Sequence, residues 1–152
     1  MRKKIFYISA FLILALLLVG CTGGKPTVSE VPTDEDLIRV AIKEFFSAVS
    51  YQKWNKAKSY CVYGENAHTL VENLENVVML FDQFCNDVTL NYTPNISEVD
   101  IDGTDAHAYG YLTIVLKCDG QVVPKHSGEG DGDITLQKIG GKWKLLGMVI
   151  LQ

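Results

Sequence analysis

Hydrophobic residues recur at helical spacing in the first part of the chain that follows residue 33. Thr33 precedes three acids, and apolar residues then repeat every three or four positions, which predicts a capped helix over residues 34–50. We expect a short second helix over 52–61 and a third over about 66–84, whose apolar stripe runs to Phe81 and Phe84. Such stripes must be buried against a common apolar surface.

From residue 88 the hydrophobic period changes to two, which is typical of strands. Pro94 is expected to end the first strand, and further strands are expected over 96–101, 106–118, 121–123, 134–139 and 142–150. In 106–118 the even-numbered residues are mostly apolar and should point inward, so that Tyr109 and Tyr111 point outward. Helices followed by antiparallel strands with tight turns predict an α+β fold.

The N-terminus carries a separate signal. Three basic residues precede the apolar run 5–19, which is short for a membrane span of about 20 residues but suits a signal peptide. Leu18-Val19-Gly20-Cys21 then resembles a bacterial lipobox. The resemblance implies a signal peptide over 1–20, a diacylglycerol on the Cys21 thiol, and a tether over 21–33. An ordinary secretory signal and an uncleaved anchor are the alternatives.

This resemblance also implies a location. A lipidated protein would be held at the extracytoplasmic face of the cell membrane or the outer membrane, with membrane lipid as its first partner. Thr22 is not the aspartate typical of inner-membrane retention, which favours the outer membrane in an organism that has one.

Removal of residues 1–20 makes the chain more acidic. Lysine plus arginine falls from 14 to 11 while the 18 acids remain, so the net charge changes from −4 to −7. Because such a surface repels phosphates, we do not expect nucleic acid as a partner.

The cysteines after Cys21 do not form a metal-binding pattern. Cys61, Cys85 and Cys118 show no CxxC spacing, so we expect no metal and no cofactor. A helix of about 18 residues between Cys61 and Cys85 would separate them by about 27 Å, far more than a disulfide spans. Any disulfide should therefore involve Cys118; three reduced thiols are the alternative.

The element order over residues 34–152 resembles the nuclear-transport-factor-2-like superfamily, which includes ketosteroid isomerase and SnoaL-type polyketide cyclases. FFSAVSYQKWNKAKSYC (45–61) is similar to its first helix junction, and DITLQKIGGKWKLLGM (133–148) to its last hairpin. The resemblance implies N-terminal helices on a strongly curved antiparallel sheet, a cone-shaped, cystatin-like roll. It also implies a pocket at the open end, and we expect its lining to include Tyr60, Tyr63, Leu112, Ile114 and Trp143.

The same resemblance gives two expectations for the outer face and for catalysis. Related domains often dimerise through the convex sheet face, so Tyr109 and Tyr111 either support a homodimer or only shield a solvated sheet. An isomerase-like base would lie between the second and third helices, where Glu65 is the only acid. Glu65 also suits a helix N-terminus, which is the favoured interpretation, and no tyrosine–aspartate pair follows it.

The three histidines provide little support for catalysis or metal binding. We expect His68 to be exposed in the first turn of the third helix, His107 to lie on the convex face, and His126 to lie in or near a loop. A cysteine–histidine nucleophile is disfavoured.

The acidic stretch HSGEGDGD (126–133) does not match calcium-binding spacings. We expect a flexible, acidic approach to the penultimate strand, in which glycines let the chain bend.

Two functional hypotheses follow. The first is a non-enzymatic lipoprotein whose domain binds a small apolar ligand or an envelope protein. The second is an isomerase- or cyclase-type enzyme that uses the cone pocket.

Overall fold

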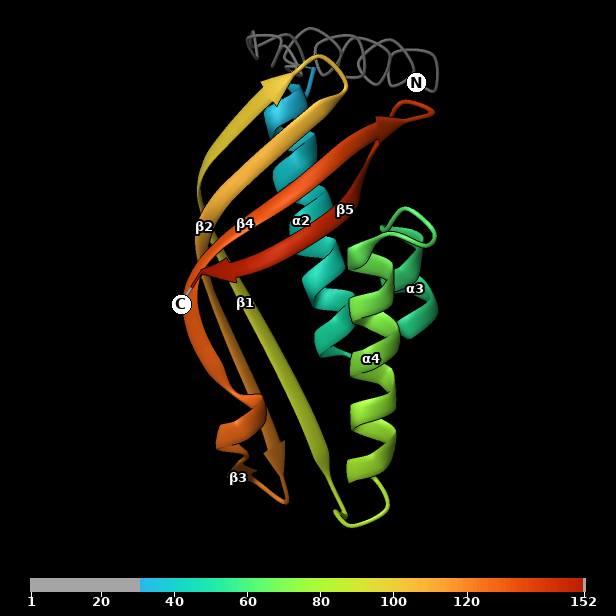
Figure 1. The fold of residues 1–152 in the computed structure, drawn as a ribbon, viewed down its shortest axis with the longest axis vertical. Helices are drawn as coiled ribbons and strands as arrows, with labels where there is room; N and C mark the ends of the chain where they lie inside the picture. Colours follow the sequence, from blue (N-terminus) through green and yellow to red (C-terminus); the bar gives the residue numbers. More distant parts are fainter. Residues whose placement is uncertain (1–30, 152) are drawn as a thin grey trace, which may run out of the picture. The chain divides into compact units, whose positions relative to one another are not determined.

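A computed structural model describes residues 31–151. The predicted signal peptide, Cys21 and most of the tether lie outside the described residues. The helices α2 (Asp34–Ser50), α3 (Trp54–Ser59) and α4 (Asn66–Phe81) precede the strands β1 (Val88–Asp102), β2 (Asp105–Cys118), β3 (Gln121–Val122), β4 (Gly128–Ile139) and β5 (Lys142–Leu151), with a 3₁₀ turn η1 (Pro124–His126) before β4 (Figure 1). Among these residues, no helix is both long and apolar enough to cross a membrane.

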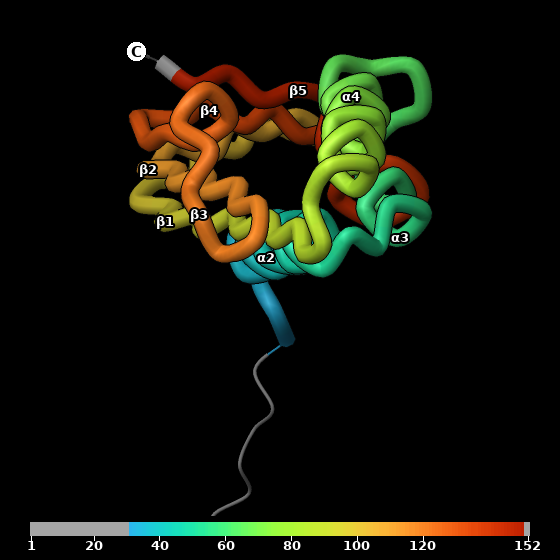
Figure 2. The backbone as a smooth tube through the Cα atoms, turned by 90° about the horizontal axis from the view of Figure 1, so that it is seen from below, coloured from blue at the N-terminus to red at the C-terminus, as the bar shows by residue number. Residues whose placement is uncertain are grey.

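The strands form one antiparallel sheet in the order β1-β2-β4-β5, with β3 paired to the end of β2. Helix α2 packs on β1, and α4 packs on β5. Seen from below, the helices and strands close around a common interior (Figure 2), which is filled by buried side chains such as Phe45, Phe46, Leu116 and Leu145. The predicted α+β architecture, helices on a curved antiparallel sheet, is confirmed.

Local sequence explains where α2 begins. The Thr33 side chain accepts a hydrogen bond from the backbone N–H of Asp36, and the Asp36 carboxylate accepts one from the backbone N–H of Thr33. This capping box satisfies two otherwise unpaired donors. The hydrogen bonds from Thr33 hold the pKa of Asp36 below its ordinary value. The helix ends at Ser50, as predicted.

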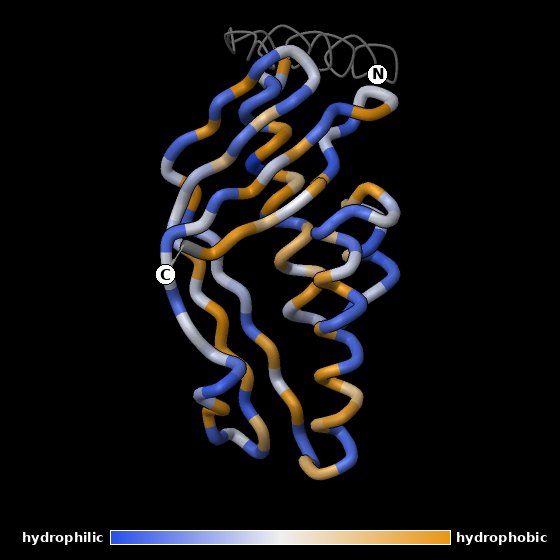
Figure 3. The backbone as a smooth tube through the Cα atoms, in the orientation of Figure 1, coloured by the Kyte–Doolittle hydropathy of each residue, from blue (hydrophilic) through white to orange (hydrophobic). Residues whose placement is uncertain are grey.

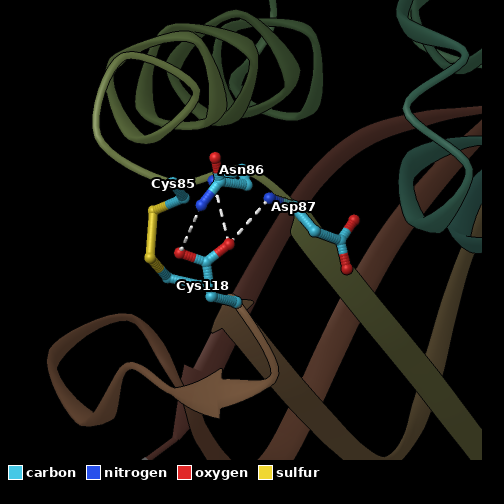
Figure 4. The surroundings of a disulfide bond; sticks show 5 residues. Cys85, Asn86, Asp87 and Cys118 are labelled. Carbon is cyan, nitrogen blue, oxygen red and sulfur yellow. Dashed lines mark hydrogen bonds between the residues drawn. A yellow bond between two sulfur atoms is a disulfide. The ribbon is translucent and has the colours of Figure 1, made fainter.

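The third helix is shorter than predicted. It ends at Phe81, and Phe84 lies outside it with 82% of its surface exposed. Just after this turn, Cys85 is joined to Cys118 by a disulfide, with 5.5 Å between the two Cα atoms (Figure 4). The prediction that any disulfide involves Cys118 is confirmed; Cys61 is a buried free thiol.

Asp119 reinforces the disulfide at the same end of the sheet. Its carboxylate accepts hydrogen bonds from the backbone N–H groups of Asn86, at 2.8 Å, and Asp87, at 2.9 Å (Figure 4). A cross-link between residues 33 positions apart contributes roughly 3–4 kcal/mol in the chain-entropy view. The end of α4 is therefore fixed to the end of β2.

Pro94 does not end the first strand, contrary to the prediction. Strand β1 runs through it without a break from Val88 to Asp102. The backbone N–H of Tyr92 points away from β2, since it donates to Ser50 Oγ at 2.8 Å. Donors two residues apart in a strand point the same way, so the missing N–H of Pro94 falls on the free edge, where no ladder bond is lost.

The stretch 126–133 is also more regular than predicted. Its residues from Gly128 onward form the first half of β4 and pair with β2 from Ile114 to Tyr109. The predicted flexible approach is therefore wrong. One of the glycines makes room for a core side chain: a Cβ on Gly132 would lie 2.5 Å from Leu112 Cδ1. The acids between the glycines point to the outer face.

The alternation in β2 follows the prediction. Its even-numbered residues are buried or half-buried, and Tyr109 and Tyr111 are exposed on the outer face. Hydrophobic and polar positions alternate along the strands (Figure 3). Opposite Gly110 the register of β1 shifts between Ile96 and Glu98. A Cβ on Gly110 would overlap the carbonyl oxygen of Asn95.

This close approach yields a stability prediction. Gly110→Ala should lower the free energy of unfolding by about 1–3 kcal/mol or more, because the new methyl meets backbone that has little room to move. Gly128→Ala is the matched control, since a Cβ there meets nothing within 4 Å, and it should be neutral or stabilising by up to about 1 kcal/mol. Urea denaturation measures both, and equal stabilities would contradict the close approach.

Candidate functional site

A hollow of about 540 Å³ lies between α2, the end of α3 and the β4–β5 hairpin. We call it the Trp143 groove. It is lined by residues from these three elements: Leu37, Val40, Ala41, Glu44, Ser59, Tyr60, Gly141, Lys142, Trp143 and Lys144.

The floor of the groove comes from a second apolar face of α2. The main stripe of this helix, which includes Ile38, Ile42 and Phe45, is buried in the core. Leu37 and Val40 lie beside that stripe and remain 40% and 56% exposed. An apolar surface that a helix leaves uncovered beside a hollow is suited to contact with another apolar group.

Trp143 forms a fixed wall of the groove. Its indole Nε1 donates to Asp34 Oδ1 at 3.1 Å, and Lys138 Nζ donates to the same oxygen at 2.6 Å. These two hydrogen bonds hold the pKa of Asp34 below its ordinary value, and the bond from Lys138 has the larger effect. The hairpin is thereby joined to the first turn of α2.

The charged side chains at the rim of the groove form hydrogen bonds with other groups of the chain. Lys56 Nζ lies 2.7 Å from Glu44 Oε2, and the Tyr60 hydroxyl lies 3.4 Å from the same oxygen. The hydrogen bond between Lys56 and Glu44 lowers the pKa of Glu44 and raises that of Lys56. Lys144 Nζ donates to the carbonyl oxygen of Ser59 at 3.1 Å. Glu44, the acid that lines the groove, therefore already has two partners within the chain.

Three smaller hollows surround the helices. One of about 420 Å³ lies between α2 and β1 and includes Phe46 and Pro94. It also includes Tyr92, whose pKa is raised by burial. A second, of about 370 Å³, includes Cys61 and His68. The third, of about 320 Å³, lies beside the start of β1.

The structure brings two of the five predicted pocket residues together. Tyr60 and Trp143 both line the Trp143 groove. Tyr63 lines the hollow beside Cys61 and is 87% exposed. Leu112 is buried in the core and Ile114 is half-buried against it; neither is among the residues that line the four hollows. Sequence reasoning missed Val40, although its position one turn from Leu37 was a usable signal.

Glu65 and His68 lie near each other in the chain but in different surroundings. Glu65 is the exposed N-cap residue of α4, its side chain makes no capping hydrogen bond, and it lines none of these hollows. His68 is only 8% exposed, so the expectation of an exposed histidine is wrong. The ring of Tyr63 covers it, with 5.0 Å between the ring centroids.

The other two histidines lie close to the expected places. His107 is exposed on the outer face of β2, and its Nδ1 lies 3.1 Å from Asp133 Oδ1. His126 is in η1, where its ring meets Phe81 at 5.5 Å between centroids. Within residues 31–151, no three side chains of histidine, cysteine, aspartate or glutamate gather as metal ligands.

Cys61 shares a hollow with His68 but is not activated. Its thiol lies 3.6 Å from the carbonyl oxygen of Ala57, and burial raises its pKa to about 12. The charge of Lys144 opposes this effect only in part. Since the thiolate is the reactive form, this cysteine is a core residue.

The raised pKa predicts that native Cys61 resists alkylation. At pH 8 the neutral thiol should predominate by about four orders of magnitude, because the pKa of about 12 lies far above the pH. Iodoacetamide should therefore modify Cys61 slowly in the folded chain and rapidly in urea, as measured by peptide mass spectrometry. Rapid modification of the folded chain at pH 8 would contradict the burial of this thiol.

Comparisons with solved structures identify the fold. Aln2 from a Streptomyces species matches with a TM-score of 0.61 and 12% identity, over 81% of this chain and 94% of Aln2. A nuclear-transport-factor-2-like protein with a cystatin-like fold from Novosphingobium aromaticivorans matches with 0.56 and 13%, over 76% and 79%. A Catenulispora acidiphila protein in complex with S-DNPA matches with 0.58 and 9%, over 76% and 90%.

At the level of sequence, no family model and no curated protein matches the chain. The identities to these solved structures support the fold alone. Residues 34–151 thus form a domain with the nuclear-transport-factor-2-like, cystatin-like fold.

Proposed function

We propose that the chain is a membrane-anchored extracytoplasmic lipoprotein whose domain is a non-enzymatic binding module. The Trp143 groove takes an apolar group, from a small ligand or from an envelope protein. The observation that carries this proposal is the exposed apolar floor formed by Leu37 and Val40 beside the fixed wall of Trp143.

The physical properties of the groove support binding. Its volume of about 540 Å³ is within the range of small-molecule sites, about 300–1,000 Å³. Covering the floor removes apolar surface from water, at about 25 cal/mol per Å². The hydrogen bond that holds Trp143 to Asp34 means that little order has to be created on binding. One protein of the same fold, from Catenulispora acidiphila, was solved in complex with S-DNPA.

The alternative of an isomerase- or cyclase-type enzyme has less support. Glu65, the weak candidate for a base, is exposed and lines none of the four hollows. A catalytic base needs to reach its substrate within about 3 Å. The lysine partners of Asp34 and Glu44 lower the pKa of both carboxyls, which makes each a weaker proton acceptor.

The anchoring part of the proposal rests on the lipobox at Leu18–Cys21. Cys21→Ser should abolish acylation, because serine lacks the thiol that takes the lipid. Incorporation of labelled palmitate and membrane fractionation measure this. The wild-type chain should be labelled and remain in membranes; Cys61→Ser, which leaves Cys21 intact, is the matched control. Equal labelling of the Cys21→Ser variant would contradict lipidation at this residue.

A pair of substitutions tests the groove. Val40→Asp places a charge in the apolar floor and should weaken binding of the probe 1-anilinonaphthalene-8-sulfonate by more than about tenfold, since a buried unpaired charge is costly. Leu80→Asp is the matched control, because Val40 and Leu80 are equally exposed on helices, at 56% and 57%. Probe fluorescence and thermal shift provide the measurements. Equal weakening by both variants would place the probe elsewhere.

A further inference from the structure

The outer face of the sheet combines exposed tyrosines with carboxylates that have no lysine or arginine partner among the described residues. Tyr109 and Tyr111 lie at its centre on β2, 38% and 42% exposed. Tyr109 is flanked by Glu98 of β1 and Asp133 of β4, and Tyr111 by Asn95 and Asp131. Side chains directly opposite in a sheet have Cβ atoms about 4.5–5.5 Å apart, so each tyrosine ring has a carboxylate within reach. We call this surface the tyrosine face.

The charge of the tyrosine face has one sign. Three further acids, Asp100, Asp102 and Glu129, point outward from the two strands that flank β2, namely β1 and β4. Among the described residues, none of these six acids forms an ion pair with lysine or arginine. Within the described part of the chain, the one basic side chain that contacts any of these six acids is His107, whose Nδ1 lies 3.1 Å from Asp133 Oδ1.

Other observations agree with a strongly negative surface. Partial burial and then the charges of Asp133, Asp100 and Glu98 raise the pKa of Tyr109. Burial, and then mainly Glu129, raises the pKa of Tyr111. Val149 on β5 lies in the same row as Tyr109 and Asp133 and is 55% exposed, so apolar surface continues across the face.

From this arrangement we infer that the tyrosine face is a docking surface for a lysine- or arginine-rich segment of another polypeptide. A cation gains from the face of a tyrosine ring and from a carboxylate beside it, and the row Glu98–Tyr109–Asp133 provides both. Aromatic residues at the centre with charge around them are typical of protein interfaces. This surface is separate from the Trp143 groove, and the inference does not depend on the proposed function of that groove.

Charge also argues against a second copy as the occupant. Two tyrosine faces brought together would oppose six carboxylates with six more, and like charges in contact are costly. A basic polypeptide would instead be attracted over about a Debye length, and salt would weaken the attraction.

Two charge variants test the inference on the full chain in an uncharged detergent. Fluorescein-labelled decalysine is the probe, and fluorescence anisotropy is the measurement. Glu98→Gln with Asp131→Asn should weaken binding about three- to tenfold, because two exposed charge contacts are lost. Glu65→Gln with Asp82→Asn is the matched control: it removes the same charge at the two ends of α4, where both side chains are exposed, and it should change affinity less than about twofold.

A second pair separates the tyrosines from the charge. Tyr109→Leu with Tyr111→Leu should weaken binding roughly five- to thirtyfold by removing two cation–π contacts. Tyr51→Leu with Tyr63→Leu, two tyrosines that are 72% and 87% exposed, should have little effect. Thermal melts identify any variant that fails to fold; for such a variant the single substitutions replace the pair.

Three results would overturn the inference. Equal weakening by the face and control charge variants would show attraction by net charge alone. Unchanged affinity of the Tyr109 and Tyr111 variant would remove the tyrosines from the site. Sedimentation of the wild-type chain as a dimer that the face variants dissociate would assign the surface to a second copy.

Discussion

The free edge of β1 is the constraint on which the rest of the domain depends. Backbone groups at Val88, Tyr92 and Ile96 point away from β2, and each is paired by a polar side chain. Gln52 Nε2 donates to the Val88 carbonyl at 2.9 Å, Ser50 Oγ accepts from the Tyr92 N–H at 2.8 Å, and Arg39 Nη1 donates to the Ile96 carbonyl at 2.7 Å. An unpaired buried backbone group costs roughly 1–3 kcal/mol, so α2 and its C-terminal turn are held against this edge.

This attachment determines where the functional surfaces lie. With α2 fixed on β1, its first turn meets the last hairpin, where Asp34 binds Lys138 and Trp143. The main apolar stripe of α2 is buried in the core, whereas Leu37 and Val40 stay partly exposed and line the groove. Covering the edge also protects it from pairing with other chains.

Much of the fold could be predicted from the sequence because it depends on local patterns of capping residues and hydrophobic periodicity. The capping box at Thr33 and the periodicity of α2 gave both ends of that helix, and the alternation in β2 gave its inward face. Pro94 and residues 128–133 were misjudged because their strand character depends on neighbours. Pro94 is tolerated only on an edge, and the glycines of β4 are held by their pairing with β2.

The site was harder to predict because it depends on how the interior is filled. A resemblance to cone-shaped domains places a pocket against β2, yet Leu112 lies in the space that Gly132 leaves and is 2% exposed. The four hollows instead lie at the margins, where helices meet strand edges or hairpins. His68 is buried and the ring of Tyr63 lies against it, a contact that spacing alone does not indicate.

The distribution of ion pairs explains why the net charge of the chain concentrates on one surface. Three lysines form ion pairs with acids of the helices: Lys56 with Glu44, Lys58 with Glu75, and Lys138 with Asp34. The acids of β1 and β4 have no such partners, because the alternation of a strand sends them to the side of the sheet that the helices do not cover. The sheet thus presents a field of one sign, and a cationic partner would sense it before contact. The Trp143 groove differs from this surface in charge, because its lining holds one acid, Glu44, and two lysines, Lys142 and Lys144, around an apolar floor.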